Sequence, residues 1–135
     1  MAADGLVSVP SKFGPQETLQ RLEKVLAEKG VTIFARIDHA AGAHDAGLAL
    51  PPTQVIIFGN AKAGTPLMQA NQTIGIDLPL KALIWTDAAG KTWLAYNDPA
   101  WLAKRHGLGP ETNAAVAALA AGLAAFAKAA TSAPE

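Results

Sequence analysis

The sequence predicts an α+β fold in which helices pack on one face of an antiparallel sheet of four to five strands. Short segments that are apolar, or that alternate apolar and polar residues, end at Gly, Pro or Asp as strands commonly do. Longer segments between them carry apolar residues at helical spacing. Two strand-like segments, residues 80–86 and 91–97, flank an Asp-Ala-Ala-Gly turn, which favours a hairpin and therefore antiparallel pairing.

The first half of the chain follows a strand–helix–strand order. Residues 6–10 alternate in polarity and predict a strand, and Pro15 suits the first position of a helix that ends at Lys29-Gly30. Residues 31–38 are rich in β-branched and aromatic side chains and predict a second strand, with residues 31, 33, 35 and 37 on one face. Residues 39–47 then predict a short helix.

The second half begins with a continuous apolar run, residues 53–59, which predicts a strand covered on both faces. Thr65 and Pro66 predict the N-cap and first residue of a helix that ends near Ala70. After the hairpin, Asp98-Pro99 predicts a helix that ends at His106-Gly107. The alanine-rich segment 112–128 is shorter than the roughly 20 residues that cross a bilayer. We therefore expect a packed terminal helix there.

The composition narrows the class of protein. The 135 residues, of which 50% are hydrophobic, suit a single domain spanning residues 1–135. Lys and Arg together number 11, and so do Asp and Glu together, so the net charge is zero. This argues against a nucleic-acid binder or a protein that binds the membrane surface. The chain has no cysteine, and its start lacks a basic segment followed by an apolar one, so we expect a cytoplasmic protein.

Both faces of the predicted hairpin are apolar, and a single layer of helices covers only one of them. The two sets of alternating residues are Leu83, Trp85, Trp93 and Ala95, and Ala82, Ile84, Leu94 and Tyr96. A second subunit, a ligand, or the loops around Pro51 and Pro79 must cover the other face. A closed homodimer is the commonest solution, and we predict one.

Candidate residues for chemistry lie after the second strand. Asp38-His39 and His44-Asp45 place two imidazoles and two carboxylates within eight residues, so His39 and His44 are candidate ligands of a metal ion. Their spacing is not the i, i+4 pair that shares one helix face. The alternative is structural, with Asp38 as the cap of the turn that follows. The sequence indicates no particular cofactor.

A glycine-rich segment, residues 59–64, has the spacing of a phosphate-binding loop. Thr65 and Pro66 occupy the positions of the lysine and hydroxyl residues that such a loop requires, so a turn before a helix is the preferred interpretation. Further along, Asp77 and Lys81 flank Pro79 and are candidates for lining a pocket.

Four segments in order resemble a known family: TIFARIDHAAGA (32–43), LPPTQVIIFGN (50–60), GTPLM (64–68) and DLPLKALIW (77–85). The chain resembles the bacterial and archaeal domain-of-unknown-function family 302 over residues 6–107. The resemblance implies a β-α-β(4)-α domain and a homodimer, and it implies no activity. The family's recurring polar positions match five residues of this chain, which are the candidate ligand-binding residues: Asp38, His39, Asn60, Asp77 and Tyr96. Ala61 stands where the family usually has proline.

Three functions remain open at this point. The first is a homodimeric module that binds a small molecule or a partner. The second is an enzyme in which His39, with Asp38 or Asp77, acts as a general acid–base or metal site. The third is a purely structural or assembly protein, with an apolar interface formed by the stripe of Val116, Leu119, Leu123 and Phe126.

Overall fold

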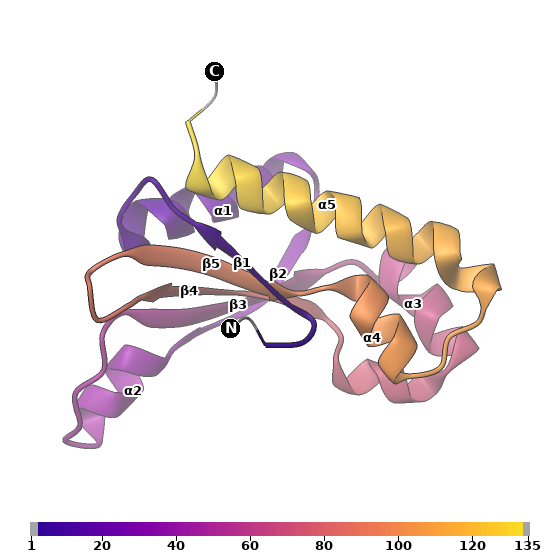
Figure 1. The fold of residues 1–135 in the computed structure, drawn as a ribbon, viewed down its shortest axis with the longest axis horizontal. Helices are drawn as coiled ribbons and strands as arrows, with labels where there is room; N and C mark the ends of the chain where they lie inside the picture. Colours follow the sequence, from indigo (N-terminus) through magenta and orange to yellow (C-terminus); the bar gives the residue numbers. More distant parts are fainter. Residues whose placement is uncertain (1–2, 134–135) are drawn as a thin grey trace.

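Five strands form one antiparallel sheet in the order β1-β5-β4-β3-β2 (Figure 1). The computed structural model describes residues 3–133. The strands are β1 (Leu6–Pro10), β2 (Thr32–Asp38), β3 (Thr53–Gly59), β4 (Leu80–Thr86) and β5 (Thr92–Asn97). Every neighbouring pair is antiparallel. The predicted α+β class and antiparallel sheet are therefore confirmed, with five strands at the upper end of the expected number.

The helices lie close to their predicted positions, with one exception. They are α1 (Pro15–Glu28), α2 (His39–Asp45), α3 (Ala61–Ala70), α4 (Pro99–Arg105) and α5 (Asn113–Thr131), with 3-10 turns η1 (Gln72–Ile76) and η2 (Pro110–Thr112). The exception is α3, which begins at Ala61, whereas the prediction placed Thr65 as its N-cap. Asn60 caps it instead, because its side-chain oxygen accepts a hydrogen bond from the Ala63 N–H at 2.8 Å. Pro66 consequently lies inside the helix.

The main core lies between the sheet and the pair α1 and α5, which run side by side over one face (Figure 1). Leu22 and Leu26 of α1 are almost fully buried against the strands. The strand and α5 residues of this core are Ile56, Phe58, Ala82, Ile84, Leu94, Tyr96, Leu123, Ala127 and Ala130. By length and composition alone, Pro110–Thr131 is apolar enough to cross a membrane. This segment is longer than the predicted 112–128, and 28% of its most apolar 18-residue window is buried where α5 packs on α1.

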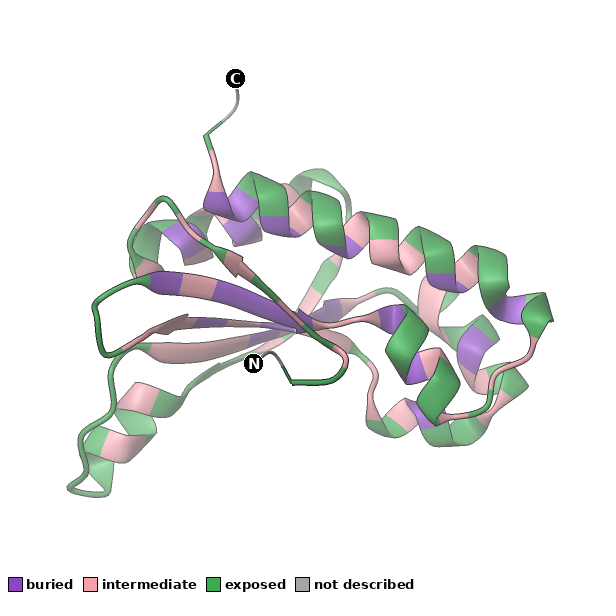
Figure 2. Cartoon of the chain, in the orientation of Figure 1, coloured by how far each residue is buried: buried purple, intermediate pink, exposed green. Residues whose placement is uncertain are grey.

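The opposite face of the sheet is more open than expected. Helix α2 lies on that side, has no buried residue and leaves most of the face uncovered (Figure 2). The prediction that the helices pack on one face is therefore wrong for α2. In β3, Ile56 and Phe58 are buried in the main core, whereas Val55 and Ile57 are only partly buried on the open face.

A bulge changes the predicted alternation of β2. The pairing register shifts between Ile33 and Ala35, so Ile33 packs against the main core while Ala35 pairs with Ile57 of the open face. The extra residue is Phe34, which is 56% exposed. A bulge of this kind redirects one side chain away from the regular pattern of the strand.

A smaller group of elements forms a lobe at one end of the sheet (Figure 1). This end lobe comprises α3, η1, α4 and the beginning of α5. Its own core consists of Leu67, Ile74, Leu102 and Val116. The end lobe carries the features described next.

Candidate functional site

An apolar pocket of about 280 Å³ opens where the end lobe meets the sheet. Its walls come from the bulge of β2, the end of β3, the first turns of α3, the segment before β4, and α5. The lining residues are Phe34, Gly59, Asn60, Ala61, Ala63, Gly64, Thr65, Met68, Leu78, Pro79, Leu80 and Leu119. None of these residues is charged, so the buried part of a ligand would meet mainly apolar surface.

Two of the residues that line this pocket are glycines, Gly59 and Gly64. A Cβ atom placed on Gly64 would lie 3.7 Å from Leu78 Cδ1 and 3.9 Å from Met68 Cε, and one on Gly59 would lie 3.7 Å from Pro79 Cβ. Gly64 lies within α3, where glycine is less favourable than alanine by about 1 kcal/mol. Gly64 therefore lowers helix stability at a position where an added Cβ would contact two residues of the pocket lining.

Two polar side chains lie on the pocket wall. The Oδ1 atom of Asn60 is occupied by its capping bond, whereas its Nδ2 group makes no hydrogen bond within the described residues 3–133. Thr65 is exposed and places a hydroxyl on the same helix. The Asn60 amide nitrogen can donate two hydrogen bonds to a ligand and the Thr65 hydroxyl one, and neither group is charged.

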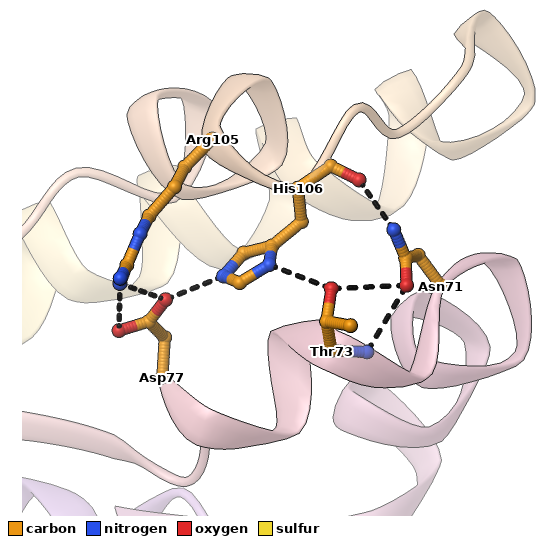
Figure 3. Close-up of polar contacts among 5 residues, drawn as sticks. All are labelled: Asn71, Thr73, Asp77, Arg105 and His106. Atoms are coloured by element: carbon orange, nitrogen blue, oxygen red, sulfur yellow. Dashed lines mark hydrogen bonds and ion pairs between the residues drawn. The ribbon is translucent and has the colours of Figure 1, made fainter.

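A polar network joins η1 to the end of α4 next to this pocket (Figure 3). Asp77 Oδ2 lies 2.6 Å from His106 Nε2, and Arg105 Nη1 donates to both oxygens of the same carboxylate at 3.0 and 2.8 Å. On the other side of the imidazole ring, Thr73 Oγ1 lies 2.9 Å from His106 Nδ1. Asn71 completes the network by donating from Nδ2 to the His106 carbonyl at 2.7 Å.

The surroundings of Asp77 favour its ionised form. Burial alone raises the pKa of Asp77, but the hydrogen bond with His106 and the positive charge of Arg105 outweigh burial and hold this pKa below its usual range. An ionised Asp77 only accepts hydrogen bonds, so His106 Nε2 carries a proton. The single proton of the Thr73 hydroxyl is donated to Asn71 Oδ1 at 3.0 Å, so Thr73 Oγ1 faces His106 Nδ1 as an acceptor.

The polar residues singled out from the sequence lie in separate places. Asp38 caps α2 by accepting from the Ala41 N–H at 2.9 Å, and it also accepts from Gln54 Nε2 at 2.9 Å. These bonds lower the pKa of Asp38, the Ala41 bond most strongly. The structural interpretation of this carboxylate as a cap is therefore confirmed. Tyr96 is buried in the main core, where burial raises the pKa of its hydroxyl.

The structure does not bring His39 and Asp77 together. Asp38 pairs with Gln54 at the start of β3, whereas β4, which follows Asp77, pairs at Leu80 with Phe58 at the end of β3. The two candidates thus lie at opposite ends of the sheet. His39 and His44 are exposed on α2, and no group of three or more potential metal-ligating residues occurs within residues 3–133. Of the five implied ligand-binding residues, Asn60 alone lines the apolar pocket.

Sequence reasoning missed His106 and Phe34 as site residues, and it assigned Gly64 to a turn before a helix. His106 was assigned only to the end of a helix, since its partners Thr73 and Asp77 are 33 and 29 residues away. Phe34 was counted as an ordinary strand residue, because the bulge leaves no local signal. Gly64 offered the one usable signal, a glycine in a segment that is otherwise compatible with a helix.

Comparison with known proteins identifies the family. The chain matches the family described as "Domain of unknown function DUF302" over residues 7–126. The chain is a DUF302 protein. A crystal structure of an uncharacterised conserved DUF302 protein from Bacillus stearothermophilus has the same fold, with a TM-score of 0.84 and 22% identity, over 95% of this chain and 99% of that one. The predicted family is thus confirmed.

Closer relatives in sequence carry a different name. Proteins of Brucella suis and Brucella abortus, both named "Fluoride-specific ion channel FluC 1", are 52% identical to this DUF302 chain over 118 residues. The match covers 87% of this chain but only 46% and 44% of those proteins. The chain therefore spans less than half the length of these relatives.

Proposed function

We propose that this DUF302 domain binds a small apolar molecule in the apolar pocket without carrying out a reaction on it. The observation that carries the proposal is Gly64, which lowers the stability of α3 and lines the pocket. Functional sites are where a protein departs from the locally most stable choice. The uncharged lining and the two neutral donors, Asn60 and Thr65, suit a bound ligand that is oriented by few polar contacts.

Binding of the fluorescent apolar probe N-phenyl-1-naphthylamine tests this proposal. We expect one probe per chain, and we expect Gly64→Leu to remove binding because the leucine side chain fills the pocket. The matched control is Gly42→Leu in α2, where a Cβ meets nothing within 4 Å. Equal probe binding by the wild type and Gly64→Leu would contradict the proposal.

We further propose that the chain forms a homodimer through the open face of the sheet. Trp85 and Trp93, stacked with centroids 6.3 Å apart, leave apolar surface on this face. Three exposed apolar residues extend the surface beside α2, namely Ile37, Leu48 and Leu50. Burial against a second copy removes this surface from water. Sedimentation velocity should give twice the mass of one chain, and Leu50→Glu should shift it to the monomer; a monomeric wild type would overturn this proposal.

The polar network of Asp77 and His106 is, in this proposal, a structural clasp of the end lobe. It fixes η1 to α4 and so positions Leu78, the residue next to Asp77, in the pocket wall. An enzyme that uses the Thr73 hydroxyl with His106 as base would instead hydrolyse p-nitrophenyl acetate. We expect no difference between wild type and Thr73→Val in that assay, and a loss of activity in the variant would favour the enzyme.

The names of the Brucella relatives point to one protein partner for this domain. We propose that this domain acts beside a fluoride-specific channel, since more than half of each relative lies outside the match. The domain itself would then be a cytoplasmic companion of the channel. Crosslinking in intact cells followed by mass spectrometry should recover a fluoride channel with this chain, and its absence from the crosslinked products would contradict the partnership.

A further inference from the structure

We infer that the ligand of the apolar pocket is a neutral, flat aromatic molecule of one or two rings. This inference rests on the proposed binding function and adds the chemical class of the ligand. It follows from the volume of the pocket, the shape of its walls and the absence of charge along its described lining.

The volume sets the size of the ligand. An engineered cavity of about 150 Å³ binds benzene. The apolar pocket, at about 280 Å³, is nearly twice as large. It therefore holds two fused rings or a chain of about eight carbons, by the same scale.

The walls distinguish rings from chains. One wall is formed by Gly59 with the rings of Phe34 and Pro79, since a Cβ on Gly59 would lie 3.9 Å from Phe34 Cε2 and 3.7 Å from Pro79 Cβ. The other wall is formed by Gly64 with Leu78 and Met68. The wall at Gly59 combines glycine backbone with two rigid rings, and a flat surface of this kind complements a planar ligand.

Met68 and Phe34 provide favourable contacts to an aromatic ring. Met68 lies between two glycines, with Sδ 3.4 Å from the position of a Cβ on Gly75 and Cε 3.9 Å from that on Gly64. Thioether sulfur and aromatic side chains both attract ring edges and faces beyond simple burial. Phe34 is 56% exposed at the bulge, so a bound ring would also cover its apolar surface.

The polar groups of the lining require a neutral ligand. Asn60 and Thr65 donate hydrogen bonds but carry no charge, and no lysine or arginine among residues 3–133 lines the pocket. A buried carboxylate would lose its hydration without an ionic partner. A rigid ring also loses less conformational freedom on binding than a flexible chain does.

Isothermal titration with four probes tests the ligand class: 1-naphthol, 1-octanol, 1-naphthoate and octanoate. We expect 1-naphthol to bind at least tenfold more tightly than each of the other three. Equal or tighter binding of 1-octanol would overturn the preference for rings, and tighter binding of either carboxylate would overturn the requirement for neutrality. If 1-naphthol fails while N-phenyl-1-naphthylamine binds, the ligand class is wrong; if both fail, the proposed function itself is wrong.

Phe34→Leu provides the matching variant, because it keeps an apolar side chain at an exposed position and removes the ring. We expect it to weaken 1-naphthol about three- to tenfold, the usual contribution of an aromatic pair, and to change 1-octanol less than twofold. The control is Ile76→Ala, which alters an exposed apolar residue that does not line the pocket. An equal loss for both probes in Phe34→Leu would overturn the aromatic contact.

Discussion

The main core and the end lobe differ in how completely their side chains are packed. Between the sheet and α1, residues such as Leu22, Leu26 and Ile56 have at most 1% of their surface exposed. In the end lobe, a core of four buried residues lies beside an apolar pocket and a partly exposed polar network. Helix α3 there contains both Gly64 and Pro66, each of which weakens a helix.

The difference indicates where stability and where function reside. Dense packing in the main core provides most of the free energy of folding, because each buried side chain is fully removed from water. The end lobe keeps space and polar contacts that a purely stabilising design would fill. Variants in the two regions should therefore separate the two properties.

The largest effect is expected in the main core. Leu26 is fully buried, so Leu26→Ala should lower the free energy of unfolding by about 2–5 kcal/mol, because it removes apolar contacts and leaves a cavity. Urea unfolding at neutral pH measures this. Binding of 1-naphthol to the folded fraction should be unchanged. A loss of less than about 1 kcal/mol would contradict the account of the main core.

The next effect separates the polar network from the main core. His106→Ala leaves Asp77 without the hydrogen bond at 2.6 Å and should cost about 1–3 kcal/mol. Hydrogen exchange should accelerate first in η1 and α4, while the amides of β4 and β5 keep their protection. Uniform acceleration over the whole chain would show that the end lobe is not a separate unit.

The pH dependence of stability isolates Asp77. Because its pKa is lowered in the folded state, its contribution is present above the unfolded pKa, about 3.9, and is lost as the pH falls through the lower folded value. The stability difference between wild type and Asp77→Asn should therefore be greatest near neutral pH and shrink below about pH 4. Urea titrations at several pH values measure it, and a constant difference would contradict the ionic role.

The smallest effect compares two helical glycines. Gly64→Ala and Gly42→Ala should each raise stability by about 0.5–1 kcal/mol, because alanine favours the helix. The added methyl of Gly64→Ala contacts Leu78 and Met68 at ordinary distances, so this helix keeps its packing. Affinity for 1-naphthol should fall in Gly64→Ala alone. Unchanged affinity in that variant would remove the functional reason for Gly64.

The sequence predicts the fold better than the site because most elements depend on local signals. Pro15 and Gly30 mark the limits of α1, and the Asp-Ala-Ala-Gly turn marks the hairpin. Helix α3 was misplaced because Asn60 competes with Thr65 as a cap, and only the tertiary structure decides between them. The network of Asp77 and His106 joins residues far apart in sequence, so no local pattern could reveal it.

The most direct test of the central claim is a map of amide chemical shifts in the ¹⁵N-labelled protein during titration with 1-naphthol. The account predicts the largest changes at Gly59, Gly64 and Leu119, which line the apolar pocket from three different elements. The chemical shifts of the Trp85 and Trp93 amides, on the open face, should not change. Changes concentrated on the open face, or no changes at all, would contradict the claim that the apolar pocket is the binding site.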